Sequence, residues 1–187
     1  MALVLTHFFL REQTMSWEEA FGFFSPPLGR ALLLALLVAL AVLPIAWSLG
    51  QLSARLMSSF HLQPVVQSPV QMLQTAASLP TKLLIGLLAI VVAPFVEELV
   101  FRGLIYPTLK QNGFPGLALW GTSLLFATIH SNLMILLPLT FLAVVLTLLY
   151  ETTDNLLAPI LAHSLFNFVN FFWVVAQPLS SGAIGAT

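Results

Sequence analysis

The stretch "VAPFVEELVFRG", residues 92–103, places Glu97, Glu98 and Arg102 directly after one of the most apolar runs of the chain. The preceding segment, "LLIGLLAIVVAPFV", carries no charge over residues 83–96. Of the whole chain, 59% is hydrophobic and only 7% is charged, whereas soluble domains have about 25% charged residues. The composition therefore predicts an all-α, polytopic membrane protein, because helices satisfy their own backbone hydrogen bonds in lipid.

Charge and cysteine content exclude several functional classes. The net charge is −1, so nothing indicates nucleic acid as a partner. The chain contains no cysteine, which excludes disulfides, cysteine-ligated metal centres and a cysteine nucleophile. Membrane lipids are the expected surroundings.

Hydrophobic patterning predicts a transmembrane helix bundle with about five spans and short interfacial helices. The predicted spans are residues 30–50, 82–109, 115–131, 132–150 and 155–176. The second is longer than the ~30 Å hydrocarbon layer requires, so we expect it to be tilted, kinked at Pro94 or extended past the lipid. Ser68 as N-cap and Pro69 in the first turn predict a short helix within the polar connection 51–80.

The N-terminal region carries signs of an interfacial helix. In "MSWEEAFGFF", residues 15–24, Ser16 and Glu19 fit a capping box, and Trp17 suits the headgroup level. The predicted organisation is an N-terminal interfacial segment at 1–29, an integral membrane domain at 30–176 with a motif-bearing core at 80–176, and a flexible tail at 177–187.

Ionisable groups inside a membrane cost ~2.5 kcal/mol or more each on insertion scales and are normally kept for function. Glu98 and Arg102 are four residues apart, so they share a helix face and can pair. Glu97 lies about 100° further around the helix and cannot share that pairing equally. An unpaired carboxylate in a low-dielectric site can take up a proton near neutrality, as a general base must.

The remaining polar groups of the predicted spans are two histidines and two asparagines. His130 ends the segment "FATIH", one turn after Phe126. His163 and Asn167 also share a helix face, and Asn170 continues that stripe. His163 and Asn167 are donors that could stabilise a developing oxyanion.

Each of these features alone has an ordinary explanation. Glu98 and Arg102 could form a structural ion pair, a buried histidine is usually satisfied within a bundle, and asparagine often links helices. Pro94 and Pro159 precede Glu97 and His163 by three and four residues, where each could free a carbonyl and bend its helix. Because three different spans supply such groups in a chain with few others, we favour one shared polar site.

Three spaced motifs carry a resemblance to a known family. They are E-E-x-x-x-R at 97–102, F-x-x-x-H at 126–130 and H-x-x-x-N at 163–167, complete and in this order. With them the chain resembles the CPBP membrane endopeptidases, which group CAAX prenyl proteases with bacteriocin-processing and self-immunity proteins, also called the ABI family. The resemblance covers roughly residues 80–176.

The resemblance implies a multi-pass peptidase of the bacterial cytoplasmic membrane, acting without a cofactor on a prenylated or other membrane-associated peptide or membrane protein. It implies that Glu97 activates a water, that His130 orients this water, and that His163 and Asn167 hold the carbonyl oxygen of the tetrahedral intermediate. The residues expected to support this site are Glu98, Arg102, Phe126 and Asn170.

Three alternatives stay open. A zinc-dependent protease could use Glu97, His130 and His163 as ligands, although the chain has no H-E-x-x-H sequence. A non-catalytic immunity or assembly protein could keep the same polar core, and a proton-coupled carrier could use buried Glu and His. Serine and aspartyl intramembrane proteolysis are disfavoured, because no G-x-S-x-G is present and the one aspartate, Asp154, falls in a predicted loop.

Overall fold

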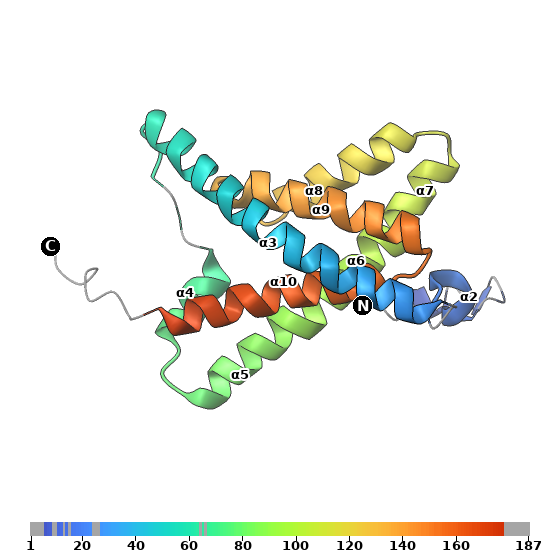
Figure 1. Ribbon diagram of the computed structural model, residues 1–187, viewed down its shortest axis with the longest axis horizontal. Coiled ribbons are helices and arrows are strands. Elements are labelled where there is room, and N and C mark those ends of the chain that lie inside the picture. Colours follow the sequence, from blue (N-terminus) through green and yellow to red (C-terminus); the bar gives the residue numbers. More distant parts are fainter. Residues whose placement is uncertain are drawn as a thin grey trace, which may run out of the picture.

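The computed structural model describes residues 6–8, 11–12, 14, 16–23, 27–63, 65 and 67–177 of the chain. Over these residues the protein consists of helices and their connections (Figure 1). The all-helical prediction is therefore confirmed. Apart from Gln177, the predicted C-terminal tail lies outside the described residues.

Four helices are long and apolar enough to cross a bilayer: α3 (Leu28–Ser59), a composite helix (Leu79–Gln111), α9 (Leu133–Thr153) and α10 (Leu157–Ala176). The composite helix has 33 residues and is about 50 Å long at 1.5 Å per residue. It therefore exceeds the ~30 Å hydrocarbon layer. This agrees with the expectation that the second predicted span is tilted, bent or extended.

The third predicted span, residues 115–131, is shorter than expected. The apolar helix there covers Leu117–Thr128, made of η3 (Leu117–Gly121) and α8 (Thr122–Thr128). It is only about 18 Å long, because the chain turns at Ile129–Asn132 before α9 begins. The described bundle thus has four long helices and this shorter one, not five full spans.

Two π-helical segments interrupt the composite helix. Its successive parts are α5 (Leu79–Leu87), η1 (Leu88–Val92), α6 (Ala93–Glu98), η2 (Leu99–Ile105) and α7 (Tyr106–Gln111), where η marks π-helical turns. Such turns are rare and are often found at functional sites. The short segment α6, which carries Glu97 and Glu98, lies between two of them.

The predicted capping box near the N-terminus is confirmed in α2 (Trp17–Phe21). The Ser16 hydroxyl accepts a hydrogen bond from the Glu19 N–H at 3.1 Å, and the Ser16 N–H donates to the Glu19 carboxylate at 2.8 Å. These bonds, first of all the one from the Ser16 backbone, lower the pKa of the Glu19 carboxyl. The acidic pair Glu18 and Glu19 therefore serves the helix start.

The short helix predicted in the polar connection is also present, as α4 (Ser68–Thr75). Its N-cap is Gln67, whose side chain makes no capping hydrogen bond, so Ser68 is the first helical residue and not the cap. Pro69 lies in the first turn, where a missing N–H has no cost. The helix packs against α10 (Figure 1).

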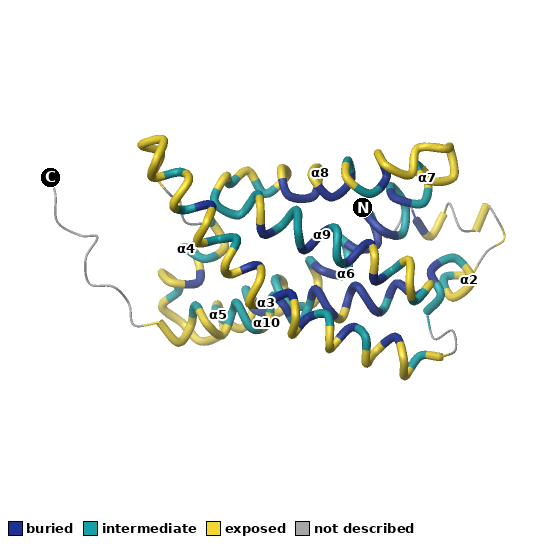
Figure 2. The backbone as a smooth tube through the Cα atoms, turned by 45° about the horizontal axis from the view of Figure 1, so that its top comes forward, coloured by how far each residue is buried: buried dark blue, intermediate teal, exposed yellow. Residues whose placement is uncertain are grey.

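The core lies where α3, α9 and α10 pack together (Figure 2). On α3 the buried stripe is built largely from alanines at positions 31, 35, 39 and 46. Small residues let membrane helices approach closely, so α3 can contact both α9 and α10. By contrast, Leu83, Leu84 and Leu87 of α5 are exposed, as expected of side chains that face lipid.

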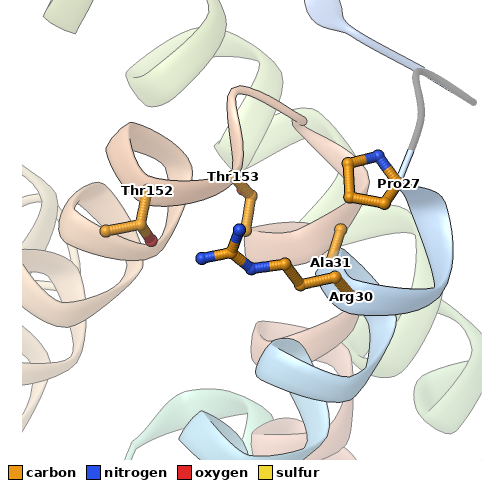
Figure 3. Close-up of a pocket in the computed structure, with 5 residues that line it drawn as sticks. All are labelled: Pro27, Arg30, Ala31, Thr152 and Thr153. Carbon is orange, nitrogen blue, oxygen red and sulfur yellow. The ribbon is translucent and has the colours of Figure 1, made fainter.

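One small pocket lies at the end of the bundle where α3 begins and α9 ends. It has a volume of about 40 Å³ and is lined by Pro27, Arg30, Ala31, Thr152 and Thr153. The Arg30 side chain reaches from α3 toward α9 (Figure 3). None of the predicted site residues lines this pocket.

Candidate functional site

The predicted pair of Glu98 and Arg102 forms in the interior of the bundle. The Arg102 Nη1 donates to Glu98 Oε1 at 2.8 Å, across one turn of the composite helix. Glu98 is 0% exposed and Arg102 is 1% exposed. Charges buried this completely need partners, and at Glu98 the Oε1 atom makes the hydrogen bonds while the buried Oε2 atom makes none.

Two further partners of Arg102 come from α9. Its Nη2 donates to the Ala143 carbonyl at 2.8 Å, and its Nε donates to the Thr147 hydroxyl at 3.3 Å. The Thr147 hydroxyl in turn donates to the Ala143 carbonyl at 2.9 Å. Sequence reasoning missed both residues, because a threonine within an apolar helix gives no signal of its own.

Glu98 also connects the composite helix to α10. Its Oε1 lies 2.8 Å from His163 Nδ1, and His163 is buried. An ionised carboxylate only accepts hydrogen bonds, so Nδ1 carries the hydrogen and donates a hydrogen bond to Glu98. The second ring nitrogen, Nε2, lies 3.8 Å from Glu97 Oε2.

Glu97 differs from its neighbour in both exposure and partners. Its side chain is 26% exposed, whereas Glu98 is fully enclosed. Arg102 is hydrogen-bonded to Glu98 and not to Glu97. The groups within Coulombic range of the Glu97 carboxylate include His163 and His130, so the structure brings three of the predicted site residues together.

His130 caps the short helix α8. The helical ladder ends there because the His130 N–H bonds to the Ala127 carbonyl, and the His130 ring nitrogen Nδ1 lies 2.7 Å from the Phe126 carbonyl. A carbonyl only accepts, so Nδ1 carries the proton and a neutral ring keeps its lone pair on Nε2. The F-x-x-x-H spacing thus fixes the tautomer as well as the position of His130.

The ring of Phe126 is the apolar centre of the site and is 0% exposed. The Arg102 guanidinium carbon lies 5.1 Å from its centroid, within the range of a cation–π interaction. The rings of His130 and His163 lie 5.1 and 5.7 Å from it. Phe126 therefore packs against members of all three motifs.

The two asparagines of α10 make different contacts. Asn167 Nδ2 donates to the Ala89 carbonyl, in η1, at 2.8 Å. Asn170 accepts a hydrogen bond from Trp47 Nε1 of α3 at 3.0 Å and donates to the Phe166 carbonyl of its own helix at 2.8 Å. Asn170 thus links α10 to α3, and the stripe predicted from spacing divides between two neighbouring helices.

The two prolines near the motifs also differ. Pro159 lies in the first turn of α10, where it does not interrupt a continuing helix. Pro94 lies inside the composite helix, in the first turn of α6, which follows η1. Only Pro94 therefore fits the expectation that a proline disturbs its helix near the site.

The zinc alternative names three of these residues as metal ligands. Within the part of the chain that the structure describes, no group of three or more His, Asp or Glu side chains is arranged to hold a metal ion. Both histidines of the site use Nδ1 toward protein acceptors. The zinc alternative therefore rests on the types of these residues and not on their arrangement.

The region that contains the three motifs is similar to known proteins. Residues 79–169, which contain all three, match the family model described as type II CAAX prenyl endopeptidase Rce1-like. A protein of Bacillus subtilis (strain 168), named "Uncharacterized protein YpbD", is 33% identical over 79 residues, an alignment that covers 40% of this chain and 38% of that protein. No solved structure matches significantly. Over residues 79–169, just under half of its length, the chain thus matches the Rce1-like type II CAAX prenyl endopeptidase family.

Proposed function

We propose that this protein is an intramembrane peptidase that hydrolyses a peptide bond with a water activated by Glu97. The observation that carries the proposal is the contrast between two adjacent carboxylates. Glu98 is enclosed and bound to Arg102 and His163, while Glu97 is partly exposed beside the same histidine. Glu98 thus has a structural partner, and Glu97 keeps its oxygens available for a proton.

The proposed reaction needs one carboxylate and one water. Glu97 removes a proton from the water as its oxygen attacks the peptide carbonyl carbon, which gives a tetrahedral intermediate. The carbon–nitrogen bond then breaks, and the proton on Glu97 passes to the leaving amine. The products are a carboxylic acid and an amine, and Glu97 returns to its ionised form.

In this proposal His130 binds the attacking water, and His163 stabilises the oxyanion of the tetrahedral intermediate. With a proton on Nδ1, a neutral His130 ring can accept a hydrogen bond from the water through Nε2. His163, whose Nδ1 contacts Glu98, can donate from Nε2 to the oxyanion when the ring carries a second proton. The resemblance implies a second donor in Asn167, one turn further along α10, whose amide contacts the Ala89 carbonyl in this structure.

The substrate class follows from the surroundings of the site and from the family. Because the motifs lie on apolar helices long enough to span a bilayer, a substrate must reach them from the membrane. The match to the family supports a prenylated or other membrane-associated peptide or membrane protein as the substrate. The Bacillus relative supports a place in a bacterial cytoplasmic membrane.

The test is Glu97→Gln, which keeps the shape and removes the base. Purified protein in proteoliposomes would be given an internally quenched peptide ending in a CAAX-type sequence, in farnesylated and unprenylated forms. General-base catalysis contributes about 10²–10⁴-fold, so we expect the variant to lose at least 100-fold in kcat. Glu18→Gln in α2, the same chemical change outside the site, is the matched control.

Two results would overturn the proposal. Cleavage by Glu97→Gln at the wild-type rate would show that another group is the base, and a biological role that survives the substitution would favour the non-catalytic alternative. Activity that is lost on chelation and restored by zinc alone would establish the zinc-dependent alternative. In that case Glu97, His130 and His163 are the first ligands to test.

A further inference from the structure

The backbone immediately before the proposed base has a gap in its hydrogen-bond ladder. At the end of η1 the ladder runs in the π register, because the Ala93 N–H bonds to the Leu88 carbonyl, five residues earlier. The next bond of this register would run from residue 94 to the Ala89 carbonyl. Residue 94 is proline, which has no N–H, so the π turn ends there and this ladder offers Ala89 no donor.

Asn167 supplies the missing donor. Its Nδ2 lies 2.8 Å from the Ala89 carbonyl, although the two residues are 78 positions apart. Prolines are tolerated in membrane helices when a neighbouring helix satisfies the freed carbonyl. The asparagine of the H-x-x-x-N motif performs this task for Pro94.

We propose that Asn167 is a positioning residue that holds η1 against α10 and so sets the place of Glu97 relative to His163. In this proposal the Asn167 amide acts on the Ala89 carbonyl of the backbone, instead of on the oxygen of the reacting peptide as the resemblance implies. The catalytic part of this proposal rests on the proposed function of Glu97. The structural part, a clamp between Asn167 and Ala89, does not.

The geometry around Glu97 explains why such a clamp matters. Glu97 Oε2 and His163 Nε2 are 3.8 Å apart, which is longer than a hydrogen bond, so no direct bond fixes their separation. It depends instead on the spacing of the composite helix and α10. Two hydrogen bonds link the composite helix to α10 at this point, from His163 to Glu98 and from Asn167 to Ala89.

A role on the backbone and a role on the oxyanion predict different results when Pro94 is changed. Pro94→Ala restores an N–H that can reach the Ala89 carbonyl, so the carbonyl no longer needs Asn167. If Asn167 positions the turn, the cost of Asn167→Ala must shrink in the Pro94→Ala background. If its amide binds the oxyanion, the cost must be the same in both backgrounds.

The experiment compares the wild type, Asn167→Ala, Pro94→Ala and the double variant as full-length proteins in proteoliposomes. The first readout is kcat and KM with the farnesylated quenched peptide. We expect Asn167→Ala to lower kcat at least tenfold with KM changed less than twofold, and to lower it less than threefold when Pro94→Ala is present. An equal factor in both backgrounds would overturn the proposal.

The second readout is amide hydrogen exchange in peptides that cover residues 88–98, which needs no substrate. Asn167→Ala should raise exchange there at least tenfold, and Pro94→Ala should suppress this increase. Unchanged exchange would overturn the clamp. If the clamp is seen but the wild type cleaves no peptide, the proposed function fails and the structural inference stands.

Asn170→Ala is the matched control for coupling. It removes an asparagine from the same helix, but its partners are Trp47 and Phe166 and not η1. Whatever its own effect, that effect should be the same with and without Pro94→Ala. Equal suppression of the Asn170 and Asn167 substitutions would show that Pro94→Ala acts by general stabilisation, which would overturn the specific link.

Discussion

Arg102→Met is the substitution that most directly tests what holds the site together. Methionine keeps much of the unbranched apolar stem and removes the guanidinium. Three donated hydrogen bonds are lost, to Glu98, Ala143 and Thr147. Glu98, at 0% exposure, then keeps a buried charge with only His163 beside it.

The size of the effect follows from this burial. Removing one partner of a buried ion pair costs about 3–5 kcal/mol, because the other charge stays desolvated. For a protein of this length, 1 kcal/mol corresponds to a shift of about 2–4 °C in Tm, so we expect Tm to fall by roughly 6–20 °C. Thr147→Val, which removes only the 3.3 Å bond, should cost about 1 kcal/mol.

Unfolding would be followed in detergent by the fluorescence of the four tryptophans. Glu98→Gln combined with Arg102→Met removes both charges and keeps an oxygen that can accept from His163. The double variant should therefore recover about 2 kcal/mol relative to Arg102→Met alone. A cost below about 1 kcal/mol for Arg102→Met, or a double variant less stable than the single one, would refute this account.

Two smaller perturbations test the contacts made by the C-terminal part of the composite helix. Gly103→Ala would place a Cβ 2.9 Å from the Phe21 ring, so it should destabilise the docking of α2 by about 1–3 kcal/mol. A lower Tm that Phe21→Leu partly restores would support this reasoning. An unchanged Tm would contradict it. Lys110→Ala breaks a short ion pair with Glu151 whose side chains are 43% and 34% exposed, so it should cost less than about 1 kcal/mol. Its effect on Tm should shrink as salt is raised, and a loss independent of salt would rule out the ion pair as its cause.

Features that depend on local spacing were predicted correctly from the sequence. Glu98 and Arg102 pair because residues four apart meet on one helix face, and this face survives the π-helical winding of η2. The capping box of Ser16 and Glu19 is likewise confined to one turn. In both cases the interacting groups are fixed by a few covalent bonds, so little else in the fold can separate them.

Features that depend on how helices end or pack were not predictable in the same way. Apolar length suggested that residues 115–131 span the membrane, but the helix ends at Thr128, where His130 caps the Phe126 carbonyl. The Arg102 partners on α9 arise from packing between segments more than forty residues apart. Neither the capping geometry nor the packing leaves a periodic signal in the sequence.

Asn167 shows why a motif residue and its chemistry must be established separately. Its spacing placed it on the face of His163 and made it a candidate oxyanion donor. The sequence also indicated that Pro94 frees a carbonyl, yet nothing local joins the two, and which carbonyl is freed depends on the π register of η1. In an α-helix it would be Ile90, four residues before the proline; in the π register it is Ala89, the carbonyl that Asn167 reaches. Pro94 and Asn167 therefore act together. Pro94 leaves the Ala89 carbonyl without a backbone donor shortly before Glu97, and Asn167 of α10 supplies that donor.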